Sequence, residues 1–134
     1  MAKSVPGIIL LVDDDDQVRR FCRDCLVRNG FDVIEADNGF DALLLAAYQC
    51  GFVDLLITDV EMPQIRGPEL VEAFRSLWPR TKTLCMSGAQ PAIFGERTDE
   101  PILRKPFRPN QLVATVHDVL ARFDSAHLPG NWPN

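Results

Sequence analysis

Four acidic residues in a row, Asp13 to Asp16, directly follow the apolar stretch IILLV. Neighbouring carboxylates repel one another, and a carboxylate beside a dry interior is costly unless a positive charge compensates it. The run therefore has two interpretations. It is either a solvated turn that starts a helix or a site for a cation. Carboxylate oxygens are among the ligands that Mg²⁺ prefers.

The first interpretation accounts for part of the run. Acidic residues at the N-terminus of a helix cap its free N–H groups and interact favourably with its dipole. We expect Asp15 or Asp16 to do this for the helix that follows. Four acids exceed what capping requires, so we expect Asp13 and Asp14 to serve the cation site.

Polar residues also stand at the ends of later apolar stretches: Asp59 after VDLLIT, Ser87 after TLCM and Lys105 after PILR. If these stretches are parallel strands, their carboxyl ends meet at one edge of a sheet with strands about 4.8 Å apart. Asp59 would then share a pocket with Asp13 and Asp14 that suits Mg²⁺. Lys105 adds a second positive charge and Ser87 a hydroxyl donor. Metal, ammonium and hydroxyl together form a site for a dianionic phosphoryl group.

Short apolar strands alternate with amphipathic helices along the chain, and these elements must position the site. The pattern predicts strands over residues 7–12, 31–36, 53–59, 82–87 and 101–104. It predicts helices over residues 16–29, from 39 to about 50, from Pro68 to Leu77, and over 108–123, with weak helical character over 89–98. The apolar face of the second helix is expected to include Ala42, Leu43, Ala46, Ala47 and Cys50. Such alternation is typical of an open α/β sheet with helices on both faces.

Composition narrows the classes of protein. The 134 residues suit one domain, and the net charge of -5 without a basic run argues against nucleic-acid binding. The chain has no apolar stretch long enough to span a membrane and no signal-peptide pattern, so we expect a cytoplasmic protein. Cys22 and Cys25 form a C-x-x-C pair, but the sequence has no second such pair and no histidine cluster that would complete a zinc site with the four cysteines. They are expected to be small apolar side chains on core faces: Cys22, Cys25, Cys50 and Cys85.

Four segments carry a family resemblance: LLVDDDDQVRR, DLLITDVEMPQIRGPEL, LCMSG and LRKPF. In order and spacing they resemble the signature segments of two-component response-regulator receiver domains, over about Ile8 to Phe123. The resemblance implies a flavodoxin-like, doubly wound α/β fold, with a five-stranded parallel sheet of order 2-1-3-4-5. It also implies a receiver domain over residues 1–123. The two prolines, the glycine and the two asparagines of residues 124–134 predict an irregular tail.

The resemblance further implies a phosphorylation chemistry. Asp59 matches the phosphoacceptor, which attacks the phosphohistidine of a sensor kinase and becomes an aspartyl phosphate. Asp13 and Asp14 match the acidic pair that binds Mg²⁺ (or Mn²⁺), Asp14 directly and Asp13 largely through water. Asp59 and the backbone carbonyl of Glu61 complete the implied metal ligands.

Three further positions match the family pattern around the phosphoryl group. Ser87 matches the hydroxyl residue that donates to it, and Lys105 the lysine that pairs with it. The Lys105–Pro106 peptide bond is expected to be cis, as is usual in the family. An aromatic residue usually lies three positions before the lysine and rotates when the site is filled. Ile102 stands there and cannot perform the same ring flip.

The implied function is that of a phosphoacceptor signalling domain which catalyses only its own phosphorylation and dephosphorylation. Phosphorylation would shift a conformational equilibrium. The expected partners are a sensor histidine kinase or histidine phosphotransfer protein and an unknown downstream protein, with neither nucleic acid nor membrane. We expect no output domain in this chain. A stand-alone protein and a piece of a hybrid kinase both remain open.

A Mg²⁺-dependent phosphatase of the haloacid-dehalogenase type is the alternative. Asp14, Asp16 and Val18 formally fit its D-x-D-x-[TV] motif, with Asp14 as the nucleophile. Against it, the chain is short and lacks both a cap insertion and a late acidic pair. It would also leave Asp59 unexplained.

Overall fold

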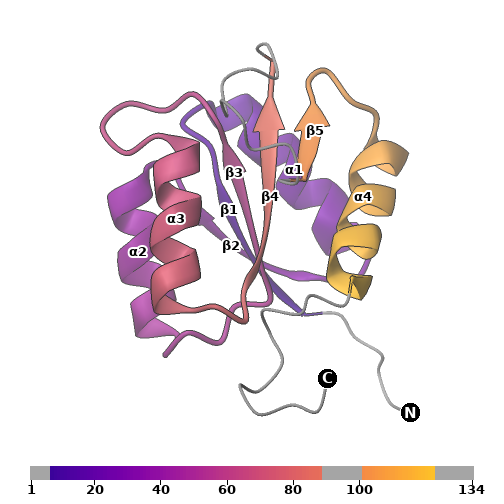
Figure 1. The fold of residues 1–134 in the computed structure, drawn as a ribbon. Helices are drawn as coiled ribbons and strands as arrows, with labels where there is room; N and C mark the ends of the chain where they lie inside the picture. The colour runs from indigo at the N-terminus through magenta and orange to yellow at the C-terminus, as the bar shows by residue number, and fades with distance from the viewer. Residues whose placement is uncertain (1–6, 89–100, 123–134) are drawn as a thin grey trace, which may run out of the picture.

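Five parallel strands and four helices lie within residues 7–88 and 101–122, which are the residues that the computed structural model describes (Figure 1). The strands are β1 (Ile8–Val12), β2 (Asp32–Ala36), β3 (Leu55–Asp59), β4 (Lys82–Ser87) and β5 (Ile102–Arg104). The helices are α1 (Asp16–Arg28), α2 (Gly39–Tyr48), α3 (Gly67–Leu77) and α4 (Pro109–Ala121). The sheet order β2-β1-β3-β4-β5 confirms the predicted topology.

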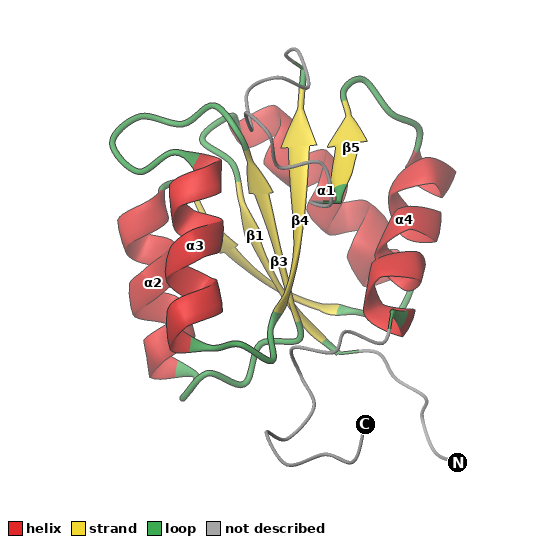
Figure 2. Ribbon diagram, viewed as in Figure 1, coloured by secondary structure: helices red, strands yellow, loops and turns green. Residues whose placement is uncertain are grey.

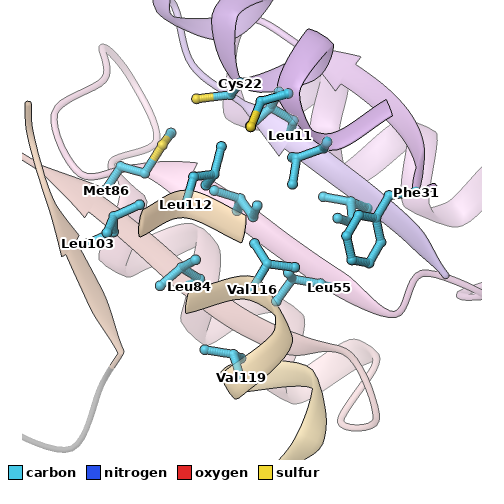
Figure 3. Packing of buried hydrophobic residues seen from close by; sticks show 14 residues of the cluster. Leu11, Cys22, Phe31, Leu55, Leu84, Met86, Leu103, Leu112, Val116 and Val119 are labelled. Atoms are coloured by element: carbon cyan, nitrogen blue, oxygen red, sulfur yellow. The ribbon is translucent and has the colours of Figure 1, made fainter. Parts of the chain in front are cut away.

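Helices cover both faces of the sheet, α2 and α3 on one side and α1 and α4 on the other (Figure 2). Side chains of β1 alternate between the two cores, with Ile9 and Leu11 on the α1/α4 side and Leu10 and Val12 on the α2/α3 side. Figure 3 shows the α1/α4 core, where residues of α4 such as Leu112 pack against strand residues. Because β1 is buried on both faces, its sequence is continuously apolar.

Capping residues set the helix boundaries near the site. Asp15 is the N-cap of α1, and its carboxylate accepts the N–H groups of Gln17 at 2.9 Å and Val18 at 3.2 Å. This confirms that the acidic run starts the helix. Asn38 caps α2 in the same way by accepting the N–H of Asp41 at 2.8 Å. Helices α1 and α2 therefore begin shortly after the ends of β1 and β2.

The predicted apolar face of α2 is partly wrong. The helix buries Gly39, Ala42 and Ala46, whereas Ala47 and Cys50 are exposed. The helix ends at Tyr48, and Cys50 then adopts a left-handed backbone with φ of 56°, which turns it away from the core. The expectation of a core position therefore fails for Cys50. The other three cysteines are buried, and none of the four forms a disulfide: Cys22, Cys25, Cys50 and Cys85.

Some predictions concern residues outside the described ranges. The weak helix expected over 89–98, the final residue of the last predicted helix and the irregular tail over 124–134 all lie there. The division into a domain and a tail thus stays a prediction. Within the described residues, none of the helices has the length and apolar character needed to cross a membrane.

Candidate functional site

Strand register brings the predicted acidic residues together at one end of the sheet. Val12 of β1 pairs with Thr58 of β3. The residues that follow, Asp13 and Asp59, therefore leave the two neighbouring strands at the same level. Asp14 is the next residue of the same loop, and ligand oxygens of the three aspartates lie within 4.8 Å of one another. The sheet thus assembles the predicted acidic pocket.

The register of the remaining strands adds the other two predicted residues. Asp59 pairs with Met86, so Ser87 lies one position further along β4. Ser87 pairs in turn with Arg104, so Lys105 lies one position beyond β5. The backbone N–H of Lys105 donates to the carbonyl of Ser87 at 2.9 Å. The two residues therefore extend the row from the acidic pocket along the same edge.

The Lys105 ammonium lies between two of the carboxylates. Its Nζ donates to Asp59 Oδ1 at 2.8 Å and to Asp13 Oδ2 at 3.3 Å. Asp13 is fully buried and Asp59 is 7% exposed, so neither carboxylate is well solvated. The Lys105–Pro106 peptide bond is cis. One ammonium thus faces two buried carboxylates, with the exposed Asp14 beside them.

These surroundings shift the pKa of all three groups. Burial raises the pKa of Asp13 and of Asp59 above the ordinary 3.8, although Lys105 opposes the shift. Burial alone would lower the pKa of Lys105, but the hydrogen bond that its ammonium donates to Asp59 and the nearby negative charges raise the pKa above 10.5. Among the residues that the structure describes, three clustered aspartates face one lysine, an excess of negative charge that a bound cation would relieve.

The structure also describes the other predicted positions, Glu61, Ser87 and Ile102. Glu61 is exposed, and its carboxylate lies 3.7 Å from the Arg66 guanidinium. Ser87 is buried at the end of β4. Ile102 is partly buried and packs against the α2/α3 core, in register with Cys85. The isoleucine is thus on the same edge strand that delivers Lys105.

Two residues that contact the Asp59 backbone were not predicted from the sequence. Thr58 is fully buried and donates its hydroxyl to the carbonyl of Asp59 at 3.0 Å. Gly67 begins α3 directly against the same peptide. A β-carbon there would collide with the Asp59 carbonyl oxygen and lie 2.8 Å from Val60 Cα. The only sequence signal for this contact is the Gly-Pro pair that starts the helix.

Replacing Gly67 by alanine is expected to displace the backbone at Asp59. The atoms in the way belong to the main chain and cannot rotate aside. We expect the free energy of unfolding in urea to fall by about 1–3 kcal/mol, the usual cost of overpacking. Gly88→Ala is the matched control, since among the residues that the structure describes a β-carbon there meets only Lys105 Cβ, at 3.9 Å. Equal stabilities of the two variants would contradict the proposed collision.

Comparison with known proteins agrees with this geometry. A family model described as the response regulator receiver domain matches residues 9–117. The chain is 34% identical over 120 residues to the sensor kinase CckA of Brucella abortus, covering 87% of this chain. It is 32% identical over 116 residues to the response regulator receiver protein CpdR of Brucella abortus, covering 84% of this chain and 95% of that protein.

A solved structure gives the same result. The chemotaxis protein CheY4 of Vibrio cholerae superposes with a TM-score of 0.75 at 31% identity, covering 86% of this chain and 99% of that one. The chain spans 13% of the length of the sensor kinase and about half of the length of two further curated relatives. Family match, sheet order and the row of residues at the strand ends agree. The chain therefore belongs to the response regulator receiver domains of two-component systems.

Proposed function

We propose that this domain accepts a phosphoryl group on Asp59, in a Mg²⁺-dependent reaction, from the phosphohistidine of a sensor histidine kinase or a histidine phosphotransfer protein. The main support for this proposal is the position of the Asp59 carboxylate. One oxygen accepts from Lys105 at 2.8 Å, and the group lies in the acidic cluster with Asp13 and Asp14. This arrangement combines a nucleophile, a fixed cation and further oxygen ligands in one pocket.

The donor set fits Mg²⁺, or Mn²⁺ as a substitute. The carboxylates of Asp13, Asp14 and Asp59 would hold the ion together with the backbone carbonyl of Glu61. All of these donors are hard oxygens, and the three carboxylates approach within 4.8 Å. When bound, the ion would neutralise negative charge on the carboxylates and on the phosphoryl oxygens. The excess negative charge of the pocket supports this assignment.

The transfer is a displacement at phosphorus. A carboxylate oxygen of Asp59 forms a bond to phosphorus, and the bond from phosphorus to the donor histidine nitrogen breaks. The electron pair of the broken bond stays on that nitrogen. Lys105 orients the attacking carboxylate and afterwards pairs with a phosphoryl oxygen, while the Ser87 hydroxyl donates to another. The contribution of these side chains is positioning and charge stabilisation, as expected for phosphoryl transfer.

Acetyl phosphate tests the proposal without a partner protein. Incubation of the intact chain with acetyl phosphate and Mg²⁺ should add one phosphoryl group per chain, detected by intact-mass measurement. The adduct should be stoichiometric and disappear slowly. An unchanged mass would contradict the phosphoacceptor role.

The phosphatase alternative receives less support from the geometry. Asp14 would be its nucleophile, yet Lys105 contacts Asp13 and Asp59 instead. Asp16, the second acid of the phosphatase motif, is 63% exposed and paired with Arg19 at 2.7 Å. Rapid turnover of a generic phosphate ester would favour the phosphatase over the receiver role.

Partners and readout follow from the family as part of this proposal. The phosphorylated domain would shift a conformational equilibrium and dock on a downstream protein. Because Ile102 lacks a ring, the shift cannot use the aromatic rotation usual in the family. Catalysis by the domain would be limited to its own phosphorylation and dephosphorylation.

The buried acids should also make stability depend on pH. Their pKa values are raised above 3.8 in the folded protein. Between the unfolded and the folded pKa values, the folded protein therefore binds more protons than the unfolded chain. Their contribution to the free energy of unfolding is therefore greatest below the unfolded value and is lost as the pH rises through the folded values. Lys105, with its pKa raised above 10.5, contributes fully throughout this range.

We expect the metal-free wild type to lose stability relative to Asp13→Asn as the pH rises from about 4, the ordinary carboxyl pKa. The measurement is urea unfolding in EDTA over a pH series. Asp32→Asn, at an exposed position of β2, is the control and should run parallel to the wild type. A wild type that gains stability relative to Asp13→Asn with rising pH would contradict the raised pKa values.

A further inference from the structure

The guanidinium of Arg19, on the first turn of α1, makes three hydrogen bonds beside the site. Nη1 donates to the backbone carbonyl of Asp13 at 2.7 Å. Nε donates to Glu35 at 2.9 Å, and Nη2 to Asp16 at 2.7 Å. The Arg19 side chain is only 14% exposed. It is thus a largely buried cation whose side chain contacts the main chain of the acidic loop, the residues Asp13 to Asp15 between β1 and α1.

The carbonyl that Arg19 holds belongs to the peptide unit that joins Asp13 to Asp14. The N–H of Asp13 is held as well, because it donates to the carbonyl of Ala36 at 3.2 Å. Asp14 itself is exposed, and within the described part of the chain its carboxylate accepts no hydrogen bond. The direction in which the Asp14 side chain points therefore depends on the conformation of its backbone.

We infer that Arg19 is a positioning residue that fixes the Asp13–Asp14 peptide, and so presents the Asp14 carboxylate to the metal ion. This inference rests on the proposed function, in which Asp14 is a metal ligand. It adds a residue that touches neither metal nor phosphoryl group. Outer contacts of this kind commonly change metal affinity by about 10–100-fold when removed.

Glu35 supplies the fixed point for Arg19. It lies on β2 in register with Leu11 of β1, so the sheet holds its backbone. Its carboxylate accepts Arg19 on one oxygen. A planar guanidinium can bond a carboxylate on one edge and a carbonyl on another, whereas a lysine ammonium lacks this forked shape. The contacts from Glu35 through Arg19 to Asp13 thus tie the loop to the sheet.

Arg23 provides a matched control one turn further along the same helix. It donates to the other oxygen of Glu35 at 3.0 Å and pairs with Asp24 at 2.9 Å. It has the same charge and shares the same anchor, but its hydrogen bonds do not include the acidic loop. Loss of Arg23 therefore reproduces the loss of a Glu35 ion pair without freeing the Asp13 carbonyl.

The test is calorimetric titration of the full chain with MgCl₂, comparing wild type, Arg19→Gln, Arg19→Lys and Arg23→Gln. Arg19→Gln should raise the Kd for Mg²⁺ by about tenfold or more. Arg19→Lys keeps the charge but not the fork, so its Kd should lie between those of Arg19→Gln and the wild type. Arg23→Gln should bind Mg²⁺ like the wild type. A purely structural role would change unfolding temperatures without separating the Kd values of the Arg19 and Arg23 variants.

The outcomes distinguish this inference from the proposed function. Equal Kd values for Arg19→Gln and Arg23→Gln would overturn the role of Arg19 while leaving the metal site in place. If Arg19→Gln does not fold, the comparison is made with Arg19→Lys. A Kd of Arg19→Lys for Mg²⁺ equal to that of the wild type would then overturn the inference. A wild type that binds no Mg²⁺ would overturn the metal-dependent function itself, and the Arg19 inference with it.

Discussion

Asp59→Asn is expected to reduce phosphorylation by acetyl phosphate to background. The carboxamide keeps the size of the side chain but loses the anionic oxygen that attacks phosphorus. Removing the nucleophile of a serine protease costs about 10⁶-fold in rate, and we expect a loss of at least about 10³-fold here. The measurement is the initial rate of phosphate incorporation at saturating Mg²⁺, followed by intact mass.

Two observations control this prediction. Asp118→Asn alters an exposed carboxylate of α4 that pairs with Arg122, and it should be labelled like the wild type. Circular dichroism should show that Asp59→Asn is folded, because it removes one of the repelling carboxylates of the pocket. Full labelling of Asp59→Asn would place the acceptor elsewhere in the chain.

Removal of divalent metal is the second change for which we expect a large effect. Without the ion, Lys105 is the one ammonium in the described part of the chain that contacts the aspartate cluster, and it would have to balance the three aspartates and the incoming phosphoryl group. Bound metal contributes several kcal/mol of transition-state charge stabilisation, so EDTA should slow labelling by at least about 100-fold. Added Mg²⁺ or Mn²⁺ in excess of the chelator should restore it.

The metal also gives a signal that does not depend on phosphorylation. A ligand that binds only the folded state raises the unfolding temperature. Mg²⁺ should therefore stabilise the wild type, and it should stabilise Asp14→Asn less because that variant lacks one carboxylate ligand. Asp37→Asn, an exposed change outside the acidic cluster, should respond like the wild type. Labelling at an equal rate in EDTA and in Mg²⁺ would contradict the metal requirement.

Much of the arrangement could be predicted because it follows from periodicity. Apolar strands that end in polar residues predict a parallel sheet with its site at one edge, and this brings Asp13 and Asp59 together. The contact of Lys105 with Asp59 follows from the same rule. The N-cap at Asp15 could be predicted from local capping chemistry alone.

The features that escaped prediction depend on contacts between main chain and distant residues. Nothing in the local pattern shows that Gly67 packs against the Asp59 peptide or that Arg19 reaches the Asp13 carbonyl. Each contact is set by how a helix lies against a strand end. Cys50 continued the helical periodicity, yet the helix stopped earlier and a left-handed turn carried it outward.

Mapping the phosphorylated residue decides whether Asp59 is the phosphoacceptor. After labelling with acetyl phosphate and Mg²⁺, borohydride would reduce the aspartyl phosphate to homoserine, and peptide mass spectrometry would locate it. We expect homoserine at position 59 and nowhere in the acidic run at 13–16. Homoserine at position 14 with aspartate intact at 59 would contradict the receiver chemistry and support the phosphatase alternative.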